Sequence, residues 1–265
     1  MQNTNNYWNK KEERKGEAKK HTEKMATEYG SEISFSAEHT RKYDENSEFF
    51  LGAGKYNTVI VLKNTDSVSA ILGEDNNNLA VLNFASYKNP GGMFLAGSGA
   101  QEECLCHESF LYNVLAKFEN TYYTENGNAK NKALYLNRAL YSPDILFERG
   151  GKKRYCNVLT CAAPNLTAAK KYCNVSDKEN SEVLASRIEF VLDILAKEKQ
   201  EVIILGAFGC GVFGQNPKEV ASVFRKLLIT KFKNVFRRVV FAIPATGNGN
   251  YEEFKSLFPG FLTNS

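Results

Sequence analysis

The chain has 265 residues, of which 43% are hydrophobic and 24% are charged, so it has enough apolar side chains for a substantial core and is not a disordered protein. Thirty-four lysines and arginines against thirty aspartates and glutamates leave a net charge of only +4. This argues against binding of duplex nucleic acid through charge alone and is compatible with an anionic small ligand. No apolar stretch approaches the roughly 18 residues of a membrane span, and the N-terminus lacks the apolar core of a signal peptide. Together with six cysteines that suit reduced thiols, these features predict a cytoplasmic protein.

The first part of the chain is expected to form a helical extension. Residues 1–57 begin as a polar and charged stretch, with a weak amphipathic pattern between Trp8 and Met25, which favours a surface helix packed on the rest of the protein. Residues 58–265 contain the apolar runs of a folded domain, without a linker or repeat that would divide it. We therefore predict an extension over 1–57 and one catalytic domain over 58–265.

Short apolar runs alternate with helix-like segments from residue 58 onward. The runs that predict buried strands are 58–62, 79–85, 155–164, 201–208 and 237–243. The segments with helical periodicity or helix-start signals are 101–118, 177–199, 216–232 and 249–258. The polar stretch 119–155 is expected to form surface connections with one short strand near 133–136. This alternation predicts an α/β fold with a mostly parallel sheet, and binding loops just after the carboxyl ends of strands.

A glycine-rich loop follows the predicted strand 201–208. Residues 206–214 read GAFGCGVFG, and a helix is expected to start near Asn216-Pro217. Backbone N–H groups in such a loop can approach an anion at a helix N-terminus, as a diphosphate requires. No Lys-Ser or Lys-Thr pair follows, so it is not a Walker loop. The alternative interpretation is a tight strand-to-helix turn that needs glycine for its backbone conformation.

A second glycine-rich loop follows the predicted strand 79–85. It leads from Asn89 through several glycines to Gln101, Glu102 and Glu103, at the start of a predicted helix. Such a loop can wrap a ligand while the two glutamates point toward it. The alternative is that the glutamates only complement the dipole of that helix.

The order of these motifs closely resembles the microbial-type poly(ADP-ribose) glycohydrolases. The matching stretches are NPGGMFLAGSGAQEECLCHESFLY (89–112), LTCAAPN (159–165) and GAFGCGVFGQNP (206–217), and the similarity runs from about Trp8 to Phe258. The resemblance implies a three-layer α/β/α macrodomain with a mostly parallel mixed central sheet and an added N-terminal helical segment. It also implies an enzyme that cleaves ribose–ribose O-glycosidic bonds and releases ADP-ribose. We expect no cofactor and no metal, because a carboxylic acid and a positioned water can break this bond and the sequence has no convincing ligand cluster.

The resemblance also assigns roles to individual residues. Glu103 aligns with the catalytic glutamate of the family and would protonate the leaving ribose oxygen, while Glu102 would orient ribose hydroxyls. Asn89 would hold the distal ribose, and Phe213 would pack on it. The residues expected to bind substrate are Asn89, Gly91, Gly92, Gln101, Gly209, Cys210, Gly211, Val212, Phe213 and Gly214.

Three alternatives stay open at this point. Met93 stands where the family has a third glycine, so the chain could instead be a macrodomain that only binds ADP-ribose, or a hydrolase of single ADP-ribosyl groups. Cys104, Cys106 and His107 suggest a zinc site, but a helix turns about 100° per residue, which sends the two thiols to different faces. A nucleophilic pair of Cys210 and His107 is the third.

The expected partners are ADP-ribose and poly(ADP-ribose) or ADP-ribosylated macromolecules, with no membrane and no sequence-specific nucleic acid.

Overall fold

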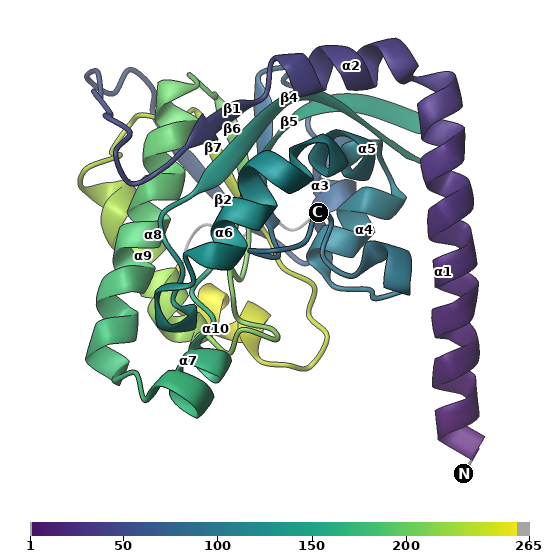
Figure 1. The fold of residues 1–265 in the computed structure, drawn as a ribbon. Helices are drawn as coiled ribbons and strands as arrows, with labels where there is room; N and C mark the ends of the chain where they lie inside the picture. The colour runs from purple at the N-terminus through teal and green to yellow at the C-terminus, as the bar shows by residue number, and fades with distance from the viewer. Residues whose placement is uncertain (1, 259–265) are drawn as a thin grey trace.

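A seven-stranded mixed sheet with helices on both faces forms the body of the computed structural model, which describes residues 2–258, with side chains from residue 11 (Figure 1). The strand order is β1-β4-β5-β3-β6-β7-β2. The strands are β1 (Arg41–Tyr43), β2 (Val59–Lys63), β3 (Leu79–Phe84), β4 (Ala139–Arg149), β5 (Lys152–Cys161), β6 (Val202–Leu205) and β7 (Arg238–Ala242). The β3–β5, β3–β6, β6–β7 and β2–β7 pairs are parallel, which confirms the predicted α/β class with a mostly parallel sheet.

The connections between the strands are mainly helical. The α-helices are α1 (Gln2–Glu28), α2 (Gly30–Glu38), α3 (Ser67–Leu72), α4 (Gln101–His107), α5 (Leu111–Leu115), α6 (Thr124–Asn128), α7 (Leu166–Cys173), α8 (Asp177–Lys197), α9 (Pro217–Ile229) and α10 (Asn250–Leu257). Shorter helical turns are η1 (Phe94–Ala96), η2 (Ala116–Phe118), η3 (Glu119–Tyr123) and η4 (Asn131–Ala133). No helix in the described part of the chain has the length and apolar character needed to cross a membrane.

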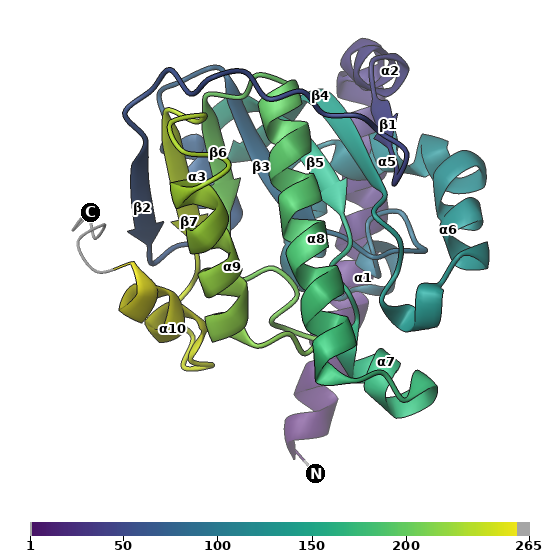
Figure 2. The ribbon, with the colours of Figure 1, turned by 90° about the vertical axis from the view of Figure 1, so that its left-hand side faces the viewer.

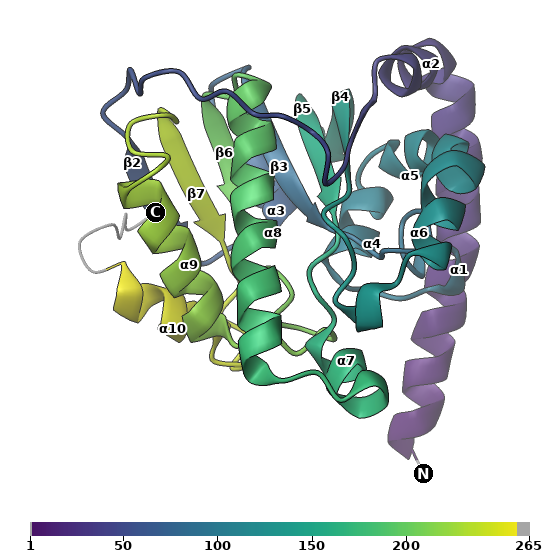
Figure 3. The same cartoon turned by 60° about the vertical axis from the view of Figure 1, so that its left-hand side comes forward.

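The sheet separates two apolar layers. Side chains alternate along a strand, so in β3 Ala80 and Leu82 join the cluster under α8 and α9, whereas Leu79 and Val81 join the cluster under α1 to α5. Figure 2 looks onto the face covered by α8 and α9, and Figure 3 shows α1, α4 and α5 on the other face. Because both faces are covered, the strands read as continuous apolar runs, which is why the sequence identified β3, β6 and β7.

Local signals fix the long helices on the α8 and α9 face. Ser176 and Glu179 form a reciprocal capping box at the start of α8, and the Asn216 side chain accepts the Lys218 N–H at 2.9 Å at the start of α9. The predicted helices at 177–199, 216–232 and 249–258 therefore agree with α8, α9 and α10 within a few residues.

The prediction for residues 119–155 was wrong. β4 is an eleven-residue, largely buried strand that pairs antiparallel with β5, and residues 133–136 include left-handed backbone at Ala133 and Tyr135 instead of a strand. A bulge between Ser142 and Ile145 shifts the β4–β5 register and interrupts the alternation that would have revealed the strand.

The predicted helix over 101–118 is broken into α4, α5 and η2. The Ser109 hydroxyl donates to the Leu105 carbonyl at 2.7 Å and accepts the Leu111 N–H at 3.1 Å. Glu148 N–H of β4 also donates to the Glu108 carbonyl at 2.8 Å. These bonds replace the helical ladder at residues 108–110, so apolar periodicity alone overestimated the length of the helix.

The N-terminal segment packs along one side of the domain. Ala18 and Met25 of α1 and Ile33 of α2 are buried in the same cluster as α4 and α5, and Figure 1 shows α1 running along this side with its N-terminal part projecting beyond the body. β1 pairs antiparallel with β4 and adds an edge strand to the sheet. Residues before 58 thus supply a strand as well as helices, and the division of the chain at residue 57 stays a prediction.

Candidate active site

A cleft of about 690 Å³ opens where β3 and β6 end. Its walls come from α4 and from the loops after β2, β3, β5, β6 and β7. This position, at the carboxyl ends of neighbouring parallel strands, is the usual ligand site of open α/β sheets, and the volume is in the range of small-molecule sites.

The structure brings most of the predicted site residues together in this cleft. Eight of them line it: Gly92, Gln101, Glu102, Glu103, Gly209, Gly211, Val212 and Phe213. Four do not appear among the lining residues. Asn89 is exposed, and its backbone N–H donates to Ser86 Oγ at 3.2 Å. Gly91 packs behind the cleft against Tyr112, and Cys210 and Gly214 belong to the far side of their loop.

Glu102 is a buried carboxyl, 3% exposed, that the protein itself surrounds with donors. Asn83 Nδ2 donates to its Oε1 at 3.2 Å, and Ser86 N–H donates to its Oε2 at 2.7 Å. Burial raises the pKa of Glu102 to about 8, although the hydrogen bonds from Ser86, Asn83 and Gly91 oppose this and only the Glu103 charge adds to it. Glu102 is therefore held in one orientation and favours a bound proton near neutral pH.

Glu103 is also buried, at 5% exposure, but it keeps one oxygen unused. Its Oε1 accepts the Met93 N–H at 2.9 Å, whereas Oε2 has no hydrogen-bond partner within the described residues. A buried unpaired carboxyl oxygen is costly unless a ligand uses it. Because Glu103 lines the cleft, this oxygen is suited to exchange a proton with a bound molecule.

Gly92 brings the two carboxyl groups together. A Cβ atom at this position would lie 2.5 Å from Glu103 Oε1 and 2.9 Å from Glu102 Oε2, and the backbone is left-handed at φ +62°. Glycine adopts this conformation without strain, and only glycine leaves room for both carboxyl groups. Met93 has an ordinary φ of −109° and still donates its N–H to Glu103, so its side chain is compatible with the loop.

Gln101 ties the start of α4 to the sheet. Its Oε1 accepts the Phe84 N–H at 2.9 Å, and its Nε2 donates to the Leu82 carbonyl at 3.0 Å and to Ser67 Oγ at 3.1 Å. Both the oxygen and the nitrogen of the Gln101 side-chain amide thus have hydrogen-bond partners in the protein. Its clearest effect is to place the two glutamates that follow it at the end of β3.

The loop between β6 and α9 offers backbone donors to the cleft. Consecutive N–H groups of Gly211, Val212 and Phe213 have no acceptor within residues 2–258, and Val212 is 83% exposed. Phe213 packs edge-on against Tyr135, with ring centroids 6.1 Å apart. Successive free N–H groups in a glycine-rich turn before a helix form a concave site for an anion.

The structure does not place the cysteines where a zinc site or a Cys210–His107 nucleophilic pair would need them. Cys104 is exposed and Cys106 is buried, and the described residues contain no group of three or more potential ligands arranged around a metal ion. Cys210 packs against the α8 and α9 layer, and burial raises the pKa of its thiol to about 12. His107 packs on Phe94 of the opposite layer, with centroids 4.7 Å apart, and burial lowers its pKa. The two are not a nucleophile and its base.

Sequence reasoning missed the residues that support the site. Asn83 is a single amide in the apolar run LAVLNFA, and a buried polar residue in such a run signals a specific partner. The β2–α3 and β7–α10 loops also reach the cleft, which the rule for carboxyl ends of strands would have indicated. The lining residues of these two loops and of the first turns of α3 and α10 are Asp66, Ser67, Val68, Ile243, Pro244, Thr246, Asn248 and Asn250.

Sequence comparison identifies the family to which this macrodomain-like fold and paired-glutamate cleft belong. The profile of the family described as "Microbial-type PARG, catalytic domain" matches residues 4–150, which is more than half of the chain. No curated protein matched the sequence. The chain belongs to the microbial-type PARG family.

Solved structures of bacterial poly(ADP-ribose) glycohydrolases are similar over most of the chain. The Deinococcus radiodurans enzyme in complex with ADP-ribose is 30% identical, with a TM-score of 0.78 over 86% of this chain and 97% of that chain. The Thermomonospora curvata enzyme is 26% identical, with a TM-score of 0.84 over 93% and 100%. The latter enzyme bound to the inhibitor ADP-HPD is 27% identical, with a TM-score of 0.80 over the same shares.

Proposed function

We propose that this protein is a poly(ADP-ribose) glycohydrolase that releases ADP-ribose from the polymer. The observation that carries the proposal is the pairing, across one cleft, of a buried carboxyl with a free oxygen and a row of free backbone N–H groups. One end of this arrangement suits the acid chemistry of a glycosidic bond, and the other suits a diphosphate. An ADP-ribose unit contains both groups.

The β6–α9 loop holds the diphosphate in this proposal. Gly211, Val212 and Phe213 donate their N–H groups to the phosphate oxygens, and no side chain at Gly211 obstructs the approach because no protein atom lies within 4 Å of its Cβ position. The ring of Phe213 packs on the distal ribose and directs it toward Glu103. Asn89 contributes only if the loop before Gly91 turns inward on binding, since its side chain does not line the cleft.

Glu103 performs the proton transfers. Its carboxylic acid protonates the leaving ribose oxygen as the glycosidic C–O bond breaks and the anomeric carbon becomes oxocarbenium-like. Water then adds to that carbon and returns its proton to Glu103, so the carboxyl group ends as it began. Glu102, fixed by Asn83 and Ser86, forms a hydrogen bond with a ribose hydroxyl and orients the sugar. The mechanism uses only these groups and needs neither cofactor nor metal.

The same proposal includes the substrates, the location and the domain organisation of the protein. Its substrates are poly(ADP-ribose) and ADP-ribosylated macromolecules. Its location is the cytoplasm, which the free thiols of all six cysteines favour. Residues 58–265 form the catalytic domain, with residues 1–57 packed on it as an extension.

Release of ADP-ribose from purified polymer and from protein that carries single ADP-ribosyl groups tests the proposal. The wild-type protein is expected to release ADP-ribose from the polymer, and Glu103→Gln is expected to bind ADP-ribose without releasing it. Binding without release from either substrate by the wild type would identify a reader instead. Release from the single-unit substrate alone would identify a mono-ADP-ribosyl hydrolase.

A further inference from the structure

The segment before β4 is held in a strained backbone conformation. Four of its residues have left-handed φ angles: Asn131 at +41°, Lys132 at +52°, Ala133 at +65° and Tyr135 at +63°. Left-handed backbone is uncommon for a residue with a Cβ atom, and a bulky side chain such as tyrosine adopts it only where the surrounding protein enforces it. Strained backbone of this kind is concentrated at the functional sites of proteins.

The buried guanidinium of Arg187 holds this segment. Arg187 belongs to α8 and is fully buried. Its Nη2 donates to the Tyr135 carbonyl at 3.0 Å and to the Leu134 carbonyl at 3.3 Å. Its Nε donates to Asn137 Oδ1 at 2.7 Å, and its Nη1 donates to the Ala162 carbonyl. Because the planar fork of a guanidinium can bind several acceptors at once, Arg187 fixes the segment against the chain just after β5.

The motif LTCAAPN at 159–165 connects the strained segment to the β6–α9 loop. The Asn165 N–H donates to the Ala133 carbonyl at 3.0 Å, and the Asn165 side chain caps the start of α7. Within the first turn of α7, the Thr167 N–H donates to the Phe213 carbonyl at 3.2 Å. The motif thus links the two parts of the chain through main-chain hydrogen bonds.

The ring of Tyr135 lies against both glycine-rich loops of the cleft. It stacks on Tyr87 of the β3–α4 loop, with ring centroids 4.1 Å apart and 10° between the planes, and meets Phe213 of the β6–α9 loop edge-on at 6.1 Å. Tyr87 and Tyr135 are buried in one apolar cluster, and the partly buried Phe213 packs against it. Phe213 lines the cleft, whereas Tyr135 is not among the lining residues. Tyr135 therefore acts on a bound ligand through its neighbours.

We propose that Tyr135, fixed by Arg187, is a positioning residue that sets the place of the Phe213 ring relative to the β3–α4 loop. That loop leads into Glu103, so the spacing between the two loops decides how far a ribose packed on Phe213 lies from the catalytic acid. Without the Tyr135 ring, Phe213 would move into the vacated space and the ribose would move with it. The inference rests on the proposed function, because it requires Phe213 to pack on the distal ribose.

Tyr135→Leu and Tyr135→Phe test this role. Both variants keep a side chain on the left-handed backbone, but only phenylalanine keeps a ring between the loops. Tyr135→Leu is expected to lower kcat for release of ADP-ribose from polymer by about 10-fold, because a misplaced reactant loses rate steeply. The Kd for ADP-ribose should rise by no more than about threefold, since the free N–H groups of the β6–α9 loop remain. Tyr135→Phe should keep kcat within about twofold of the wild-type value.

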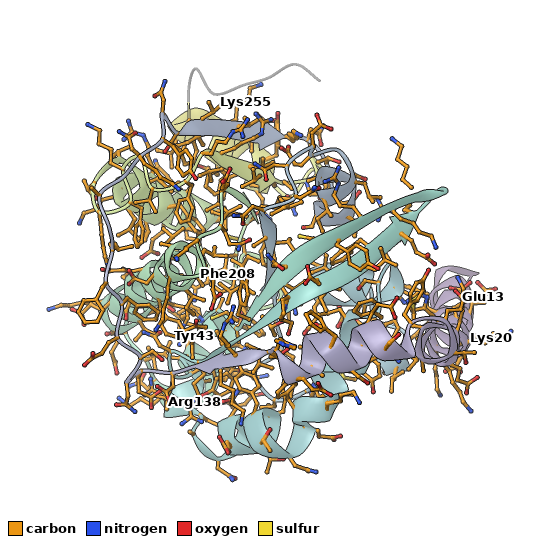
Figure 4. The ribbon with its side chains drawn as sticks, turned by 90° about the horizontal axis from the view of Figure 1, so that it is seen from above. Glu13, Lys20, Tyr43, Arg138, Phe208 and Lys255 are labelled. Atoms are coloured by element: carbon orange, nitrogen blue, oxygen red, sulfur yellow. The ribbon has the colours of Figure 1, made fainter. Side chains whose placement is uncertain are left out.

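A double variant and a matched control separate positioning from general destabilisation. Once Phe213→Leu has removed the second ring, adding Tyr135→Leu should lower kcat by less than about twofold further. The control is Tyr43→Leu, which removes another buried tyrosine ring, 6.0 Å from that of Phe49, from the edge strand β1, where Figure 4 labels it. This variant should lose stability and keep a native kcat. A native kcat in folded Tyr135→Leu, or independent losses in the double variant, would overturn the inference.

Arg187→Lys tests the support of Tyr135. Lysine keeps the charge but replaces the planar fork with a single ammonium group. We expect kcat to fall as in Tyr135→Leu, with a similarly small change in Kd. A native kcat in the folded variant would overturn the role of Arg187.

The position of the Phe213 ring can also be observed without turnover. In NMR spectra of the wild type with ADP-ribose, nuclear Overhauser effects are expected between the Phe213 ring protons and the distal ribose. They should persist in Tyr135→Phe and weaken in Tyr135→Leu. Their absence from the wild type, or equal effects in all three proteins, would overturn the inference. A wild type that shows these effects but releases no ADP-ribose from polymer would overturn the proposed function and leave the positioning role supported.

Discussion

The two glycine-rich loops of the cleft differ in how much of each loop is packed against the rest of the protein. The β3–α4 loop is packed on several sides: Gly91 lies against Tyr112, Gly92 against both carboxyl groups, and Gly97 against α1. The β6–α9 loop is packed at Gly209 and Gly214 but open at its tip, with free space around Gly211 and a largely exposed Val212. Dense packing fixes the position of an acid to a fraction of an ångström, whereas free N–H groups can adjust to a charged ligand. We infer that the first loop supplies the chemistry and the second supplies the binding.

Gly92→Ala is the most severe test of the packed loop. The added methyl group would displace one or both carboxyl groups and strain a left-handed backbone, and a catalytic group moved by about 1 Å loses roughly 100-fold in rate. We expect kcat to fall by about that factor while ADP-ribose still binds. Gly150→Ala is the matched control, because it places the same strain, at φ +58°, in a hairpin turn with no atom within 4 Å. Similar kcat losses in both variants would contradict the packing account.

Glu102 predicts a pH dependence of stability. Its folded-state pKa of about 8 is above the value of about 4.3 in an unfolded chain. Between these values the folded state binds more protons than the unfolded state, so stability falls as the pH rises. From pH 5 to pH 8.5 we expect the wild-type Tm to fall more than that of Glu102→Gln, by about 5 °C or more. Parallel Tm curves would show that Glu102 is ionised throughout.

Gly97→Ala tests whether α1 is part of the packed loop. A side chain there meets the Lys11 backbone, and the left-handed φ of +76° adds strain, so α1 has to shift. We expect a loss of about 1 to 3 kcal/mol in the free energy of unfolding, measured by urea denaturation. Faster hydrogen exchange in residues 11–25 should accompany it. A variant with native exchange rates in α1 would show that the helix is not held by this contact.

Gly211→Val should have the smallest effect, confined to binding. The position has room for a side chain in the free protein, so the free energy of unfolding should change by less than about 0.5 kcal/mol. If the loop wraps a diphosphate, the valine obstructs it, and the Kd for ADP-ribose should rise about 10-fold by calorimetry. An unchanged Kd would place the diphosphate elsewhere.

The sequence predicted what depends on local pattern and missed what depends on distant contacts. Buried parallel strands such as β3 and β6 are apolar runs that stand out by themselves, and the paired glutamates follow a recognisable glycine loop. β4 was missed because a bulge breaks its alternation. The packing of Gly97 on α1 and the enclosure of Gln101 arise from residues 17 to 86 positions away along the chain. No local pattern encodes these contacts or the free Glu103 oxygen.

We assign chemistry to the β3–α4 loop and binding to the β6–α9 loop. This assignment is tested most directly by measuring binding and turnover on one variant, Glu103→Gln. The amide keeps the size of the side chain and removes the exchangeable acid proton. We predict that the Kd for ADP-ribose stays within about threefold of the wild-type value, while kcat for release of ADP-ribose from polymer falls by about 10² to 10⁴. Native turnover in a correctly folded Glu103→Gln protein would contradict the account.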